Sequence, residues 1–172
     1  MSGQFSIPVK GLAVGYYSFD FEIDKKFFDL FEESEIKNGS LKATVKAEKG
    51  ATHIDISVVI EGHVEVICDR CLESFAFPLY CENRLIAEFS GENTDDPDIL
   101  IISHDEPELD MKQYFYEFIL LALPIQRIHP ESKDGISSCN PTMIKKLDEH
   151  RSIEDDNNND PRWDALKNLK NN

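Results

Sequence analysis

Residues 41–89 read LKATVKAEKGATHIDISVVIEGHVEVICDRCLESFAFPLYCENRLIAEF, and this stretch decides the fold. Apolar and polar side chains alternate in three successive runs, around 41–47, 54–66 and 75–89. Alternation with a period of two is the pattern of a half-buried β-strand. The stretch therefore predicts an antiparallel β-meander that turns at Gly50 and at CDRCLE (68–73), with one face in water. Gly62, inside the middle run, is expected to mark a bulge.

The segments beside the meander predict further strands and helices. Residues 17–23 alternate in the same way and predict a strand, and residues 25–31 after Asp24 predict a short helix. An acidic segment, 92–110, surrounds an apolar island at 99–102 that predicts one short strand. A helix is expected over 110–123, with Asp110 and Gln113 as a capping box. Its apolar stripe is expected in the core: Met111, Tyr114, Phe115, Phe118 and Leu121.

The C-terminal part has a different composition. Asn140 and Pro141 predict the start of a short helix that runs to His150, with Met143, Ile144 and Leu147 as its apolar side. The polar run RSIEDDNNND (151–160) has little to bury and is expected to be a disordered linker. Asp160 and Pro161 then repeat the start signal for a last helix.

These elements together predict an α+β fold of one main domain. We expect a mainly antiparallel β-meander or a partly closed barrel, with a packed helix and short C-terminal helices. The β-rich core domain is expected to span 1–126 and to include the helix 110–123. Residues 127–172 are expected to form a C-terminal extension with two short helices and an acidic disordered linker.

The charge of the 172-residue chain bears on its partners. There are 33 acidic residues against 18 lysines and arginines, a formal net charge of -15. Such a field repels the phosphates of nucleic acid, so a basic or neutral protein is the expected direct partner. Direct RNA binding would need a local basic and aromatic cluster. The best one that the strand alternation offers is Lys42, Lys46, Arg70, Arg84 and Tyr80.

The sequence also indicates a compartment. The longest apolar stretch, 115–124, is too short to cross a bilayer, and the N-terminus lacks the pattern of a secretory signal. We therefore expect a cytoplasmic protein whose four cysteines stay reduced or bind metal.

Cys68 and Cys71 form a CxxC pair at a turn between two expected strands, where two thiolates can bind one zinc ion. A structural zinc takes four ligands, and the sequence offers only Cys139, His129 and His150 to complete the set. A redox pair and ordinary structural thiols are the alternatives. A redox CxxC usually opens a helix after a strand, unlike this one. Cys81 shares the spacing of its apolar neighbours and is expected in the core.

No catalytic constellation is found in the sequence. P-loop, dinucleotide-binding, HExxH, nucleophile-elbow and EF-hand motifs do not occur. His53 and His63 alternate with apolar residues on the middle strand and are expected on its hydrated face. The sequence therefore predicts a protein that is not an enzyme.

The C-terminal segment DPRWDALKNL (160–169) predicts a small amphipathic helix. A helix this short rarely stands alone in water, so it must dock either on its own domain or in the groove of a partner. In the second case the expected contacts are Arg162, Trp163, Leu166 and Leu169.

Three motifs in order, CDRCLE, LLALPIQRIHPE and DPRWDALKNL, resemble the YceD family of bacterial and plastid proteins. The resemblance covers roughly residues 10–170 and implies a non-enzymatic role in ribosome biogenesis, in support of 23S rRNA accumulation and large-subunit assembly. The commoner family pattern has further cysteines after the LP…HP segment, where this chain has only Cys139. The resemblance therefore implies no complete metal site, and a zinc site of Cys68, Cys71 and Cys139 would need a fourth ligand such as His129 or water.

The leading hypothesis is an assembly factor that binds a basic ribosomal protein or a pre-ribosomal particle of the large subunit. No membrane and no small-molecule substrate are expected, and zinc is the one cofactor that the sequence leaves open. The alternative is a small metal-binding or redox module that works through the CxxC pair.

Overall fold

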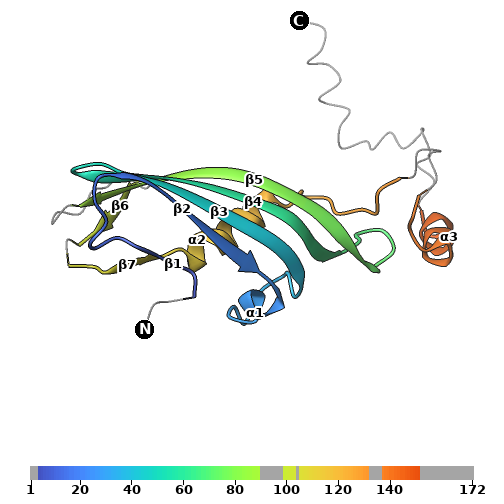
Figure 1. The fold of residues 1–172 in the computed structure, drawn as a ribbon. Helices are drawn as coiled ribbons and strands as arrows, with labels where there is room; N and C mark the ends of the chain where they lie inside the picture. Colours follow the sequence, from blue (N-terminus) through green and yellow to red (C-terminus); the bar gives the residue numbers. More distant parts are fainter. Residues whose placement is uncertain (1–3, 90–98, 104, 132–136, 152–172) are drawn as a thin grey trace, which may run out of the picture.

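The computed structural model describes residues 4–89, 99–103, 105–131 and 137–151, and its main feature is one open sheet (Figure 1). Five strands lie in the order β2-β3-β4-β5-β6. Their bounds are Gly15–Ile23, Gly39–Lys49, His53–Ile67, Ser74–Phe89 and Ile99–Ile102. The pairs from β2 to β5 are antiparallel, and the edge strand β6 runs parallel to β5. The predicted meander is confirmed, whereas the sheet of the described residues does not close into a barrel.

The long strands pair without a bulge at Gly62, so that prediction was wrong. Leu41 and Gly62 are direct partners in an uninterrupted register between β3 and β4. Gly62 has a φ of +143°, and a Cβ atom there would clash with the carbonyl oxygen of Ser40. Glycine is therefore required at this position because the backbone of β3 approaches it so closely.

The core lies between the sheet and the helix α2 (Lys112–Ala122), which packs against β5 (Figure 1). The inward side chains of β3 and β4 are almost fully buried, as the alternation predicted. From α2 and its N-cap, Met111, Phe115 and Ile119 are fully buried. Leu121, expected in the core, is 81% exposed, because its position faces away from the sheet.

The predicted capping box of α2 is also wrong. The N-cap is Met111, which makes no side-chain cap hydrogen bond. The Asp110 carboxylate accepts a hydrogen bond from the backbone N–H of Lys112, and the Gln113 amide donates to Glu117 one turn later. The Gln113 side chain thus stabilises the exposed helix surface rather than the helix start.

A small layer covers the core on the side of the sheet where α2 lies; its short helix was predicted, whereas its two strands were not. Strands β1 (Ser6–Pro8) and β7 (Glu108–Asp110) pair antiparallel, and the short helix α1 (Lys25–Phe28) lies beside them (Figure 1). The Asp24 carboxylate caps α1, and Phe27 packs edge-on against Phe5 at 4.9 Å between ring centroids. Strands of three residues carry too little periodicity for sequence-based prediction.

The helix α3 (Pro141–Glu149) begins where the sequence predicted. The Asn140 side chain caps it by accepting hydrogen bonds from the backbone N–H groups of Thr142 and Met143. No residue of α3 is buried, and Leu147, expected on its apolar side, is 49% exposed. The predicted linker and last helix lie outside the described residues. Among the described helices, none has the length and apolarity that crossing a membrane requires.

Candidate metal centre

The turn between β4 and β5 places two cysteines side by side. The N–H of Cys68 donates to the Glu73 carbonyl at 2.9 Å, and the N–H of Leu72 donates to the Cys68 carbonyl at 2.9 Å. Leu72 adopts a φ of +62°, the one left-handed non-glycine residue in the described part of the chain. This tight reversal brings the Cys68 and Cys71 side chains to the same side of the turn.

His129 reaches the turn from the segment that follows α2. The N–H of Asp69 donates to the Arg127 carbonyl at 2.7 Å, and the N–H of Arg127 donates to the Asp69 carboxylate at 2.6 Å. The Arg127 guanidinium also pairs with Glu35 at 2.8 Å. These bonds hold the chain against the cysteine turn two residues before His129.

Cys139 is the third cysteine to arrive, just before α3. Its N–H donates to the Ser137 hydroxyl at 3.2 Å, and the Asn140 amide donates to the Glu73 carboxylate at 2.7 Å. Asn140 therefore both caps α3 and ties its start to the β4–β5 turn.

Together these segments bring four candidate ligands into one cluster. The Sγ atoms of Cys68 and Cys139 lie 3.7 Å apart. The Nδ1 atom of His129 lies 3.4 Å from the Cys71 sulfur and 3.8 Å from the Cys139 sulfur. All four ligand atoms lie within 4.8 Å of one another. Zinc bonds of about 2.3 Å to sulfur and 2.0 Å to nitrogen place tetrahedral ligand atoms about 3.5–3.8 Å apart, so the donor set fits zinc.

The electrostatics of the cluster favour a bound cation. Burial raises the pKa of the Cys68 thiol, but N–H groups of Cys71, Arg70 and His129 and the His129 ring outweigh burial and lower this pKa to about 6. For Cys139, the Ser137 hydroxyl lowers the pKa, but burial and the neighbouring sulfurs of Cys68 and Cys71 raise it above its ordinary value. A thiolate at one cysteine thus disfavours ionisation of the neighbouring cysteine, and a bound metal ion would offset this repulsion.

The three cysteines of the cluster are buried, and His129 is half-buried. Cys68, Cys71 and Cys139 are 0%, 2% and 6% exposed. The Phe75 ring covers the His129 imidazole at 4.5 Å between centroids. Four protein ligands leave no position for water or substrate on a tetrahedral ion, which is the arrangement of structural rather than catalytic zinc sites.

The other predicted site residues lie elsewhere. His150 is the exposed C-cap of α3 and does not belong to the cluster. Cys81 packs partly buried against the core of the sheet, as predicted, where burial raises its pKa. His53 and His63 are exposed on the hydrated face of β4, also as predicted. The segment with Arg162, Trp163, Leu166 and Leu169 lies outside the described residues.

The predicted RNA cluster is divided. Arg70 lies in the cysteine turn, outside the strands that carry Lys42, Lys46, Tyr80 and Arg84. Lys42 forms an ion pair with Asp20 at 3.0 Å, and Arg84 pairs with Asp55 at 2.6 Å.

The sequence did not reveal the left-handed Leu72 or the Asp69–Arg127 contact. A glycine or asparagine at position 72 would have signalled the first.

The comparisons with known proteins give one finding. A family model described as "Large ribosomal RNA subunit accumulation protein YceD" matches residues 55–170. This range contains all four residues of the cysteine and histidine cluster and most of the β4–β5 hairpin. Neither the comparison with curated proteins nor that with solved structures found a match.

Proposed function

This chain belongs to the YceD family, and we propose that it supports accumulation of 23S rRNA and assembly of the large ribosomal subunit in the cytoplasm. The family match carries this proposal, because the family is described by large ribosomal RNA subunit accumulation. We further propose that the chain acts by binding a protein, without catalysis.

Two observations support binding over catalysis. The three buried thiols and His129 supply four possible ligands, and a zinc ion held by all four would have no position left for a reacting molecule. The net charge of -15 repels RNA and attracts the cationic proteins of the ribosome at long range. A chain of this charge would also shield such a protein from premature contact with RNA.

Depletion of the protein in its native host tests the biological role. We expect the ratio of mature 23S to 16S rRNA to fall and large subunits to decrease in sucrose gradients. A plasmid copy of the full chain should restore both. A normal ratio and normal gradients in depleted cells would contradict the role.

Affinity purification of the tagged full chain tests the mechanism. At low salt we expect basic ribosomal proteins or a pre-ribosomal particle of the large subunit, and a moderate salt wash should release them, because exposed charges are screened. Recovery of neither would contradict the proposal. Tight, salt-resistant capture of protein-free RNA would favour direct RNA binding instead.

We propose that Cys68, Cys71, His129 and Cys139 hold a structural zinc ion. Protein purified without chelator should contain about one equivalent of zinc. The double variant Cys68→Ser, Cys71→Ser should contain none, whereas Cys81→Ser should keep the metal, because Cys81 lies outside the cluster. Metal-free folded protein with a reversible Cys68–Cys71 disulfide would favour the redox module.

The domain division and the C-terminal contacts also belong to this proposal. We propose a core domain over 1–126 and an extension over 127–172, whose residues Arg162, Trp163, Leu166 and Leu169 contact the partner. Trp163→Ala with Leu166→Ala should reduce the recovery of ribosomal protein while the zinc content stays unchanged. Equal recovery would remove these residues from the interface.

A further inference from the structure

The sheet has one face that nothing in the described part of the chain covers. Helices α1 and α2 and the strands β1 and β7 all lie on the other side (Figure 1). The uncovered face, called the outer face here, consists of the outward side chains of 16–22, 42–48, 55–61 and 80–86. Four long strands thus present a broad and rigid surface.

Acidic side chains outnumber basic ones on the outer face. Its bases are Lys42, Lys46 and Arg84, and its acids are Asp20, Glu22, Glu48, Asp55, Glu61 and Glu82. Lys42 and Arg84 are already paired within the face, with Asp20 and Asp55. The ion pairs of the described residues leave Glu22, Glu48, Glu61 and Glu82 without a cation. A partner that covers this face must therefore bring positive charge.

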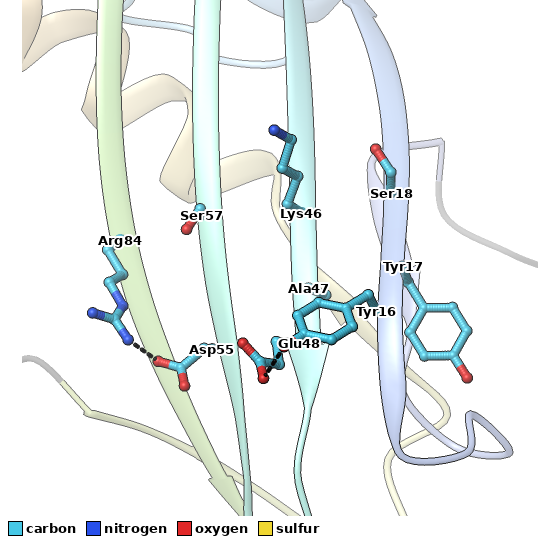
Figure 2. A pocket seen from close by; sticks show the side chains of 9 residues that line it. All are labelled: Tyr16, Tyr17, Ser18, Lys46, Ala47, Glu48, Asp55, Ser57 and Arg84. Atoms are coloured by element: carbon cyan, nitrogen blue, oxygen red, sulfur yellow. Dashed lines mark hydrogen bonds and ion pairs between the residues drawn. The ribbon is translucent and has the colours of Figure 1, made fainter.

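A hollow of about 490 Å³ lies on this face at one end of β2, β3 and β4 (Figure 2). Its walls include Tyr16, Glu48, Asp55 and Arg84. Glu48 and Asp55 are direct cross-strand partners; Asp55 is paired with Arg84 at 2.6 Å, whereas the ion pairs of the described residues give Glu48 no cation. Figure 2 shows the amine of Lys46 directed away from these two carboxylates.

Tyr16 lines one side of the hollow, and its side chain is not packed in the core. It is 80% exposed, and its hydroxyl donates to the Glu48 carboxylate at 2.7 Å. This bond holds an aromatic ring beside two carboxylates. An arginine or lysine side chain that enters the hollow would meet the ring by a cation–π contact and the Glu48 carboxylate by charge-assisted hydrogen bonds.

We propose that the outer face docks a cationic protein segment and that the hollow beside Tyr16 receives one of its arginine or lysine side chains. This proposal rests on the proposed protein-binding function and adds the surface and the chemistry of the partner. The same face disfavours RNA, because phosphates would meet the excess of carboxylates.

Titration of the ¹⁵N-labelled full chain with a fifteen-residue peptide of alternating arginine and serine tests this proposal. At low salt we expect amide shifts on the outward residues of β2, β3 and β4. The double variant Tyr16→Ala, Glu48→Gln should weaken peptide binding by about tenfold, because it removes both the ring and a carboxylate. The control Leu30→Ala, Glu33→Gln makes a similar exposed change away from the outer face and should keep the affinity.

Three results would overturn the proposal. Peptide shifts could appear elsewhere than on the outer face, the control could weaken binding as much as the Tyr16 variant, or a twelve-nucleotide RNA could bind this face more tightly than the peptide. The double variant is then tested in depleted cells. If it loses peptide binding and still restores 23S rRNA, the docking surface stands and its link to the ribosome fails. If depletion never lowers 23S rRNA, the proposed function fails by itself.

Discussion

The sheet body, by which we mean the main sheet with α1 and α2, and the cysteine cluster are stabilised in different ways. The sheet body buries a continuous apolar cluster to which every strand of the main sheet, α1 and α2 contribute. Among the described residues, the cysteine cluster buries Cys68, Cys71 and Cys139, and the partly buried Phe75, Met143 and Ile144 pack against it. The sheet body therefore holds itself by apolar burial and strand pairing, whereas the cluster and α3 depend on a few polar contacts and on ligand chemistry.

The largest expected effect is a loss of stability of the sheet body. Phe115 is fully buried and packs against Phe21 at 5.3 Å between ring centroids. Phe115→Ala should lower the free energy of unfolding by about 3–5 kcal/mol in urea titrations, because it leaves a cavity in the core. On the same helix, Leu121→Ala should change it by less than about 0.5 kcal/mol. Equal effects would contradict the assignment of the buried helix face.

A second prediction concerns the close approach of the backbones of β3 and β4 at Gly62. Gly62→Ala should cost about 2–3 kcal/mol, because the new methyl group meets the rigid backbone of Ser40 and the φ of +143° disfavours a side chain. Gly11→Ala is the control, since Gly11 also has a positive φ but open space around its Cβ position. It should cost only about 1 kcal/mol. Thermal unfolding measures both, and a tolerated Gly62→Ala would contradict the close approach of the two strands.

Metal removal separates the two regions. A chelator should abolish the protection of the amides of 139–150 from hydrogen exchange, because α3 has no buried residue of its own. The sheet amides should keep their protection, and the free energy of unfolding of the sheet should change by less than about 1 kcal/mol. Phe115→Ala should instead lower the free energy of unfolding of the sheet and leave the zinc content unchanged. Loss of protection throughout the chain on chelation would show that the two regions are one cooperative unit.

The same difference explains what the sequence predicted. The strands β3, β4 and β5 and the helix α2 follow from periodicity, because each buries one face along many residues. The short strand β6 was predicted from its apolar residues, but its parallel pairing with β5 and the pairing of β1 with β7 were not, since these pairings depend on contacts between segments far apart in the chain. The exposure of Leu121 was missed because α2 covers the sheet with a narrower stripe than its apolar residues suggest.

The candidate site was predicted in its parts but not in its geometry. The CxxC pair indicates a metal or redox role locally, because two residues between cysteines suit one ion. His129 lies 58 residues from Cys71 in the sequence, so no spacing rule could decide between it and His150. The Asp69–Arg127 contact explains why His129 and not His150 lies in the cluster, because it holds the chain before His129 against the cysteine turn.

The smallest expected effect concerns the polar contacts of the outer face. Asp20 accepts a hydrogen bond from the Thr44 hydroxyl at 2.8 Å and pairs with Lys42. The Thr44 hydrogen bond first and the Lys42 contact second hold the pKa of Asp20 below its ordinary value. Because the carboxylate is favoured in the folded state, its contribution to stability is present above about pH 4 and is lost as the pH falls through the lower folded pKa.

Thr44→Val should raise the pKa of Asp20 toward its ordinary value, measured by ¹³C NMR titration of the carboxyl group, whereas Ser40→Ala on the same strand should leave it unchanged. The effect on unfolding should be hard to detect, because solvent screens an exposed carboxylate. Unlike Phe115, Asp20 can thus lose its partner without loss of the fold. An unchanged titration of Asp20 in Thr44→Val would mean that the outer face does not order its polar side chains, and a preformed hollow beside Tyr16 would lose its support.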